Sequence, residues 1–317
     1  IGFFIIRNPF LNPHVLRMNR TGKKSQAGPL RKSGSPPLPP DVHRLFLEAV
    51  AHHQSKRLSE AENLYTHILN QFPSHADTLH LRGLLAFQQG QHSLAVAYIG
   101  QAIDQDATKP HYYYNLGLSL EKEERWVEAV TAYRQALSLK PEYVEALSNL
   151  GHVFRRQRQW ADALGAFQQA LQLQPRSADL HNNLGVTYKE QGDLELALKQ
   201  YREALTISPQ HAEALNNMGV VLQDQGKLTD AAEAFQQALT IKPAYAHAHY
   251  HLGLVRLWEG RQQDALDCFQ RSADLTGNHG RGQAPSFVTK ARIKHDLEQL
   301  PHLTTKTPDL SLPPDSA

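Results

Sequence analysis

Small and large apolar positions recur every 34 residues between Val42 and Gly277. If each repeat is numbered 1 to 34, position 8 is glycine or alanine and position 20 is always alanine. Position 24 is large and apolar in every repeat: Tyr65, Ile99, Tyr133, Phe167, Tyr201, Phe235 and Phe269. Glycine inside a helix costs about 1 kcal/mol relative to alanine, so its recurrence indicates a close helix–helix crossing. The alternation of small and large residues predicts interdigitating helices.

Turn residues divide each repeat into two helices. Glycine at position 15 (Gly90, Gly192, Gly226, Gly260) can end the first helix. Proline near position 32 ends the second helix. We therefore predict an all-α fold, a right-handed superhelical solenoid of helix–turn–helix repeats. The predicted repeats span residues 42–75, 76–109, 110–143, 144–177, 178–211, 212–245 and 246–277.

The flanking segments lack the repeat. Residues 1–41 are basic and proline-rich, and we expect them to be disordered. Residues 278–300 predict a loop followed by a capping helix, with Ile293, Leu297 and Leu300 on one face. Residues 301–317 contain three prolines and are expected to be a disordered tail.

Asparagine occupies position 6 of four consecutive repeats, at Asn115, Asn149, Asn183 and Asn217. Asparagine is a mediocre helix former because its amide competes for nearby backbone groups. A side-chain amide offers one acceptor and two donors, which match the backbone of an extended peptide. The alternative is that the asparagine bonds a neighbouring helix or water as a feature of the fold.

The small residues at positions 8, 20 and 27 and the proline at position 32 identify the chain as similar to tetratricopeptide repeat proteins. The asparagines resemble the ladder of the superhelical repeats of O-linked N-acetylglucosamine transferases, where such residues hold the substrate chain. The resemblance implies a groove lined by the first helix of each repeat, with these four asparagines as peptide contacts. The pattern departs at position 6 of the outer repeats, which hold Leu47, Leu81 and His251.

Other residues fall at groove positions by the same resemblance. Asn182 and Asn216 at position 5 add amides beside the ladder, and His251 replaces the asparagine in the last repeat. Lys122, Arg155, Arg156 and Lys189 make the middle of the implied groove basic, which favours a partner with acidic character. We expect Trp258 to pack in the core under the C-terminal helix rather than contact a ligand.

The composition argues against disulfide-stabilised, membrane-spanning and metal-dependent classes of protein. The single cysteine, Cys268, rules out an intramolecular disulfide and is expected to be packed rather than nucleophilic. No stretch reaches about 18 apolar residues, so we expect a cytoplasmic protein without a membrane contact. His247, His249 and His251 lack a further ligand at a suggestive spacing, so we predict no metal site and no cofactor.

We therefore predict a non-catalytic scaffold that binds an extended protein segment through the asparagine ladder. The alternative is the substrate-recognition part of an enzyme, such as a transferase or oxygenase, whose catalytic domain lies elsewhere. Nucleic-acid binding through the basic residues 1–40 is a third and weaker interpretation, because these residues lie outside the repeats. The identity of the partner and the oligomeric state are left open.

Overall fold

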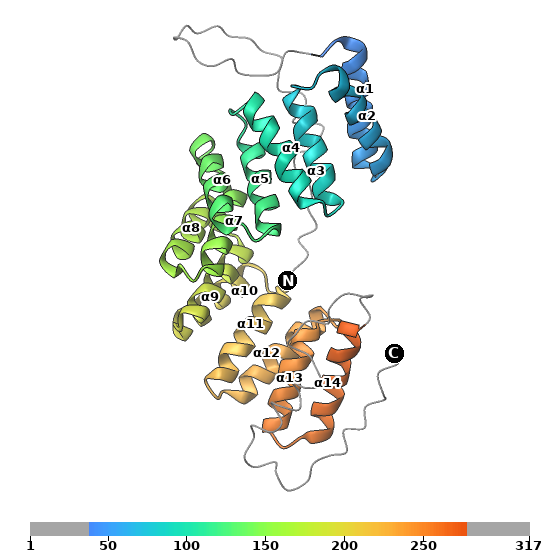
Figure 1. The fold of residues 1–317 in the computed structure, drawn as a ribbon. Helices are drawn as coiled ribbons and strands as arrows, with labels where there is room; N and C mark the ends of the chain where they lie inside the picture. Colours follow the sequence, from blue (N-terminus) through green and yellow to red (C-terminus); the bar gives the residue numbers. More distant parts are fainter. Residues whose placement is uncertain (1–37, 278–317) are drawn as a thin grey trace. The chain divides into compact units, whose positions relative to one another are not determined.

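The protein is described by a computed structural model that covers residues 38–277 with fourteen α-helices (Figure 1). Its contacts divide the chain into two compact units, residues 1–173 and 174–317, each described by itself. Unit 1 contains α1 (Pro40–Gln54), α2 (Leu58–Gln71), α3 (Ala76–Gln88), α4 (His92–Gln105), α5 (Pro110–Lys122), α6 (Trp126–Leu139), α7 (Val144–Arg156) and α8 (Trp160–Leu173). Unit 2 contains α9 (Ala178–Gln191), α10 (Leu194–Ile207), α11 (Ala212–Asp224), α12 (Leu228–Ile241), α13 (Ala246–Trp258) and α14 (Gln262–Gly277).

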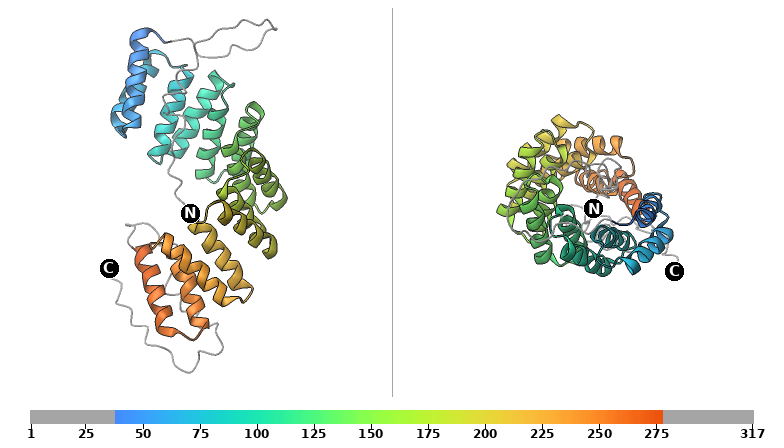
Figure 2. Two further views of the ribbon diagram at one scale, coloured as in Figure 1. Left: turned by 180° about the vertical axis from the view of Figure 1, so that it is seen from behind. Right: turned by 90° about the horizontal axis from the view of Figure 1, so that it is seen from above.

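The helices form antiparallel pairs, one pair for each repeat, and the paired helices lie side by side in the views of Figure 2. Within each unit, the second helix of a repeat also packs against the first helix of the next repeat. The predicted all-α solenoid class of helix–turn–helix repeats is therefore confirmed. The first helix begins at Pro40, since proline fits the first turn of a helix. The expected capping helix and the terminal tails lie outside the described residues, apart from residues 38–41.

The close crossing inferred from glycine at position 8 is present within the repeats. A Cβ atom placed on Gly117 would lie 2.5 Å from the Tyr133 ring, and one on Gly151 would lie 2.8 Å from the Phe167 ring. Both rings are fully buried. The large residue at position 24 therefore packs directly on the backbone of the partner helix, where no side chain fits.

The turn inside each repeat uses a left-handed residue at position 15. Glycine fills this position in four repeats, with φ between 75° and 102°. Lys56, Glu124 and Arg158 take the same conformation in the other three, with φ of 58° to 59°. Because a Cβ atom disfavours this region, these three turns keep a conformation that glycine would adopt more easily.

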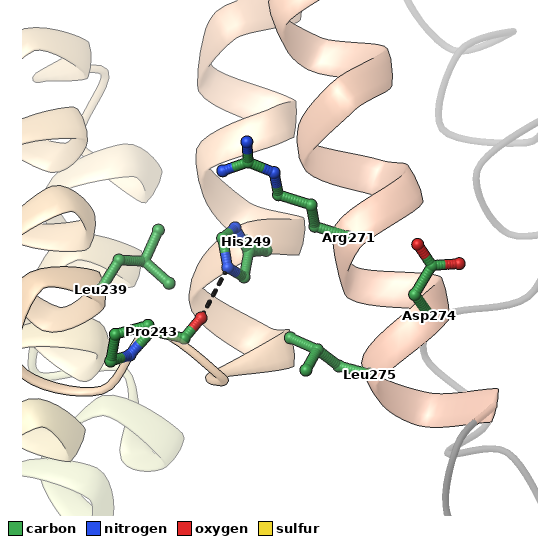
Figure 3. A pocket seen from close by; sticks show the side chains of 6 residues that line it. All are labelled: Leu239, Pro243, His249, Arg271, Asp274 and Leu275. Atoms are coloured by element: carbon green, nitrogen blue, oxygen red, sulfur yellow. Dashed lines mark hydrogen bonds between the residues drawn. The ribbon is translucent and has the colours of Figure 1, made fainter.

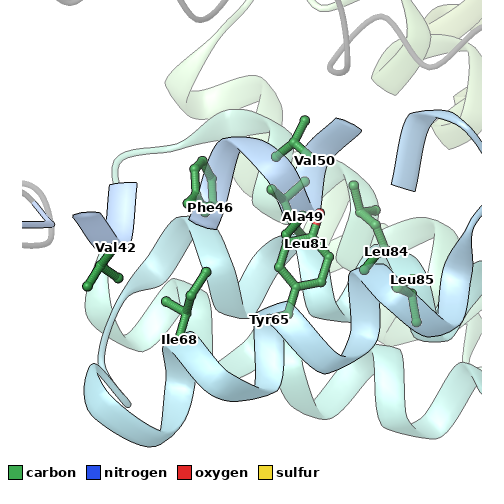
Figure 4. Packing of buried hydrophobic residues seen from close by; sticks show 10 residues of the cluster. Val42, Phe46, Ala49, Val50, Tyr65, Ile68, Leu81, Leu84 and Leu85 are labelled. Atoms are coloured by element: carbon green, nitrogen blue, oxygen red, sulfur yellow. The ribbon is translucent and has the colours of Figure 1, made fainter. Parts of the chain in front are cut away.

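The core consists of small clusters of buried apolar side chains that extend from one repeat into the next. In the first cluster, Tyr65 and Ile68 of α2 are fully buried between α1 and α3 (Figure 4). Phe46 enters from α1, and Leu81 and Leu85 enter from α3. Each helix pair thus buries its apolar stripe only against its neighbours, as the stacking of repeats requires.

Candidate peptide-binding surface

The first helices of successive repeats lie close enough to contact one another, as α3 does with α5, and α11 with α9 and α13. Side chains at position 6 of one helix therefore meet side chains at position 5 of the preceding one. This face of the first helices is called the A-helix face below. It carries the asparagines that the sequence singles out.

Three of the four asparagines donate a hydrogen bond to the preceding repeat. The Asn115 amide lies 2.8 Å from His80 Nε2, and the Asn149 amide lies 3.3 Å from the Tyr114 hydroxyl. In unit 2, Asn217 Nδ2 donates to Asn182 Oδ1 at 3.0 Å. Each bond joins residues 35 positions apart, so it links position 6 to position 5 of the repeat before it. The asparagines therefore connect repeats, whether or not they also hold a ligand.

Asn115 belongs to a buried polar cluster. Its side chain is 5% exposed, and His80, which accepts its hydrogen bond, is 3% exposed. The His80 ring stacks on Tyr112 with centroids 4.4 Å apart and meets the edge of His111 at 5.1 Å. Burial first, and then the neighbouring histidines, lower the pKa of His80 well below its usual value. His80 is therefore neutral with its proton on Nδ1, and Asn115 acts as its structural partner.

Unit 2 carries two pairs of amides, one on α9 and one on α11. Asn182, Asn183 and Asn217 are half-buried, whereas Asn216 is 4% exposed. The Asn216 amide approaches Asn217 Oδ1 only at 3.5 Å, and its own Oδ1 has no partner among the described residues. The Asn182–Asn217 bond uses one acceptor and one N–H, so three N–H groups of these two amides remain without a hydrogen bond to another described residue. Asn217 Oδ1 receives only the long contact from Asn216.

Three of the predicted basic residues lie in unit 1 and one lies in unit 2. In unit 1, Arg156 is exposed and lies over the Trp126 ring, 5.8 Å from its centroid, while Arg155 is half-buried. Lys122 is exposed at the end of α5. Lys189 belongs to α9 of unit 2, where it is half-buried. Unit 1 thus contains a cation–π pair, Arg156 with Trp126.

The end of the A-helix face lies on α13, which carries His251 and Trp258. His251 stacks on the Phe235 ring, with centroids 5.5 Å apart and an angle of 13° between the planes. The sequence predicts that Trp258 packs under the C-terminal helix. Trp258 is 48% exposed, but that helix lies outside the described residues, so its packing stays a prediction. Its neighbour Leu257 is buried in its place, because α13 turns that side toward Phe269 and Ala265.

The remaining candidates for chemistry are engaged in packing. His249 Nε2 donates to the Pro243 carbonyl oxygen at 2.9 Å, and the His247 ring lies beside Tyr245. Cys268 packs against the core of unit 2, and burial raises the pKa of its thiol. Among residues 38–277, no group of three or more histidine, cysteine or carboxylate residues is placed to hold a metal ion.

Comparison with known proteins gives the family. Tetratricopeptide repeat models match residues 142–210 and 176–244, and further repeat models match residues 76–109, 122–158 and 216–279. Together the matches cover more than half of the chain. The chain belongs to the tetratricopeptide repeat proteins.

Relatives and solved structures agree with this family. A segment of 110 residues is 27% identical to the auxiliary subunit NAA15 of the N-terminal acetyltransferase A complex of Arabidopsis thaliana, covering 35% of this chain and 12% of that protein. A tetratricopeptide repeat protein from Parabacteroides merdae is 16% identical, with a TM-score of 0.66 over 81% of this chain and 97% of that one. Pseudomonas aeruginosa PilF is 16% identical, with a TM-score of 0.57 over 71% and 97%. These structures share the fold.

Tetratricopeptide repeats are protein-interaction modules, and this chain is accordingly a protein-binding scaffold. Within residues 38–277, none of the helices has the length and apolar character needed to cross a membrane. Sequence reasoning missed His80 and Tyr114, the acceptors for two of the asparagines. The signal that could have found them is their repeat position. His80, Tyr114 and Asn182 all occupy position 5, and the next repeat has an asparagine at position 6.

Proposed function

We propose that this tetratricopeptide repeat protein holds an extended segment of a partner protein along its A-helix face, through the side-chain amides of unit 2. The observation that carries the proposal is the Asn217–Asn182 hydrogen bond at 3.0 Å. It fixes both amides, so little side-chain entropy remains to be lost when a ligand binds. Their remaining N–H groups match the carbonyl groups of a peptide backbone, and Asn217 Oδ1, which Asn216 approaches only at 3.5 Å, can accept from a backbone N–H.

Unit 1, considered by itself, offers fewer amides for backbone binding and a cation that would select side chains. Asn115 is buried, so its amide cannot contact a ligand at the surface. Asn149 is therefore the partly exposed ladder asparagine of unit 1. Arg156 over Trp126 offers a cation beside an aromatic face. This pair suits an acidic side chain of the partner, because arginine forms charge-assisted hydrogen bonds with a carboxylate.

The test begins with capture of partners by the intact chain and by an Asn182→Ala/Asn217→Ala variant. Asn63→Ala is the matched control, because Asn63 is exposed on the second-helix side of the first repeat. A segment bound by the intact chain is then synthesised, and its affinity for each variant is measured by calorimetry. We expect the double variant to lose about tenfold or more in affinity, since two or more hydrogen bonds are removed.

Folding must be checked in the same experiment, because Asn217 also connects two repeats. Circular dichroism and urea unfolding of the double variant should resemble those of the intact chain within about 2 kcal/mol. If a well-folded double variant binds the same peptide with unchanged affinity, the amides are only structural and the proposal fails. An Arg156→Glu variant tests the acidic preference separately, and its loss of affinity should shrink at high salt.

A second candidate function is the recognition of substrates on behalf of a separate catalytic protein. The similarity to an auxiliary subunit of an acetyltransferase complex favours it, although this chain spans about an eighth of that subunit's length. Under this hypothesis, one stoichiometric partner is a catalytic protein, and adding the chain lowers its KM for a protein substrate. If the captured partners include no catalytic protein, only the scaffold function remains supported.

A further inference from the structure

Position 34 of a repeat lies at the N-terminus of the next first helix, and in two repeats it is a histidine. His211 precedes α11 in unit 2, and its Nδ1 accepts a hydrogen bond from the Ala214 backbone N–H at 3.1 Å. His75 precedes α3 in unit 1, where its Nδ1 accepts from the Thr78 backbone N–H at 3.3 Å. Each ring therefore caps a helix, because it satisfies a backbone donor that has no partner within the first turn.

His211 makes a second hydrogen bond, which reaches the first helix of the preceding pair. Its Nε2 donates to Asp179 Oδ1 at 3.1 Å, so the start of α11 is joined to the start of α9. The Asn217–Asn182 bond joins the same two helices further along. The His211 side chain is 11% exposed, whereas Asp179 is exposed. Because Nε2 carries the proton and Nδ1 accepts, the ring in this arrangement is neutral.

Two carboxylates lie beside the ring. Glu213, in the first turn of α11, has its Oε2 atom 3.8 Å from His211 Nδ1. Its other oxygen, Oε1, accepts from Lys242 Nζ at 3.0 Å, at the C-terminal end of α12. The hydrogen bond to Asp179 is the main reason that the pKa of His211 is raised above its usual value. Burial acts in the opposite direction, and the charges of Asp179 and Glu213 add to the increase.

His75 has the same cap but different charges beside it. Position 2 of its repeat is His43, where the repeat of His211 has Asp179. Burial is the main reason that the pKa of His75 is lowered; Asp77 opposes this shift and His43 adds to it. Two histidines at the same repeat position therefore respond to pH in opposite directions, because the residue on the preceding first helix differs.

His249 provides a contrast within unit 2. Its Nε2 donates to the Pro243 carbonyl oxygen at 2.9 Å, in the turn between α12 and α13 (Figure 3). The ring lines a cavity of about 400 Å³ whose other walls come from α12, from this turn and from α14. The acceptor of its proton is an uncharged carbonyl. His211 differs because its two nitrogens contact groups that favour opposite protonation states: a backbone N–H favours the neutral ring, and the carboxylates favour the charged one.

We propose that His211 is a helix cap controlled by its own protonation. In the neutral state, Nδ1 accepts from Ala214 and caps α11. In the protonated state both nitrogens donate, Nε2–H to Asp179 and Nδ1–H to Glu213 Oε2, so the Ala214 N–H loses its acceptor. Protonation therefore strengthens the link between α9 and α11 and releases the first turn of α11. The proposal is independent of the proposed function, because it is measured at His211 and Ala214 without a ligand.

The direction of the pKa shift sets the pH window. The pKa of folded His211 lies above the ordinary value of 6.5, so its link to the carboxylates is strongest below about pH 6.5. The link weakens as the pH rises through the folded pKa. The hydrogen bond from His211 lowers the pKa of Asp179, so this carboxylate stays charged throughout the window. The cap made by His75 behaves in the opposite way: it is intact above about pH 6.5 and is lost as the pH falls through its own lower pKa.

The test is a titration of the full-length chain between about pH 5 and about pH 9, followed by nuclear magnetic resonance. The imidazole nitrogen signals give the titration midpoint and the tautomer of His211 and of His75. We expect His211 to titrate at a higher pH than His75, with its proton on Nε2 in the neutral form. The Ala214 amide reports the cap: its protection against hydrogen exchange should fall by about tenfold as His211 takes up a proton.

Three substitutions separate the cap from the charge. His211→Asn keeps a capping side chain that does not titrate, so the Ala214 amide should stay protected at every pH. Asp179→Asn keeps an acceptor for Nε2–H but removes the charge, so His211 should titrate at a lower pH. Asp193→Asn removes an exposed carboxylate beyond the opposite end of α9. It is the matched control and should leave the titration of His211 unchanged.

The exchange of partners is tested by Glu213→Gln. It should also lower the titration midpoint of His211, because the protonated ring loses a charged acceptor. An unchanged midpoint would mean that the charged ring binds Asp179 alone, and the proposed exchange would be wrong. The proposal is also overturned if Ala214 protection does not change as His211 titrates, if His211 titrates at or below the pH of His75, or if Asp179→Asn shifts the midpoint no further than the control does.

Discussion

The role of the buried asparagine can be tested at Asn115. Replacement by alanine removes the N–H that His80 Nε2 accepts at 2.8 Å. Since His80 is 3% exposed, its nitrogen would lose the partner without gaining water. An acceptor left in this state costs about 1–3 kcal/mol. Alanine returns up to about 0.7 kcal/mol through its better helix propensity. The expected net loss of unfolding free energy is about 1–2 kcal/mol.

A double-mutant cycle separates this bond from other effects of the substitution. His80→Phe keeps an aromatic ring that can stack on Tyr112 but removes the acceptor. In that background, Asn115 has an unsatisfied buried N–H, so Asn115→Ala should be neutral or stabilising. The sign of its effect should therefore reverse. Coupling of this kind is what distinguishes a direct interaction from two independent changes.

The assay is urea unfolding at pH 7, combined with hydrogen exchange of the α3 and α5 amides, because repeat arrays can unfold in parts. Asn63→Ala serves as the control and should stabilise by a few tenths of a kcal/mol, since Asn63 is an exposed helical residue. If Asn115→Ala costs the same with and without the His80→Phe change, the bond does not hold the two repeats together and the reasoning is refuted.

Three further predictions concern the repeat architecture. Gly151→Ala should lower the melting temperature, because its Cβ would lie 2.8 Å from a buried ring, whereas Gly165→Ala, with no atom within 4 Å, should raise it. Glu124→Gly should stabilise by about 1 kcal/mol in urea, since φ is 58° there; unchanged or lower stability would contradict the strain assigned to this turn. Burial lowers the pKa of His111 and of His152 to about 4. Both therefore bind protons mainly in the unfolded chain as the pH falls below about 6.5, so each should cost about 2 kcal/mol of stability between pH 7 and pH 5. Stability followed by urea unfolding should be full above pH 6.5 and fall toward pH 4, and a flat profile would contradict it.

The fold could be predicted because the residues that shape each repeat lie close together in the sequence. Glycine at position 8 and an aromatic residue at position 24 come from the two helices of one repeat, so a single repeat contains the information for its own crossing. The left-handed turns were predictable only where glycine marks them. Glu124 and Arg158 give no such signal, since an ordinary residue is held in this conformation by the helices on either side.

The candidate site was only partly predictable. The positions of Asn182 and Asn217 on the first helices indicated a polar face, but the sequence could not tell which amides remain available. Asn115 and Asn217 look alike in the repeat, yet one meets a buried histidine and the other meets an amide of the preceding repeat. The difference arises from the residue at position 5 one repeat earlier and from how deeply it is buried.

The repeat length, the two helices of each repeat and the contacts inside a repeat could be predicted without the structure, because these features depend on residues that are neighbours in the chain. The tertiary structure alone decided which residues meet between repeats. It joined each of three asparagines to a residue 35 positions earlier, and it gathered the lining of the cavity from three helices and a turn. These contacts depend on the direction of side chains across the stacked helices, which the periodic pattern does not specify.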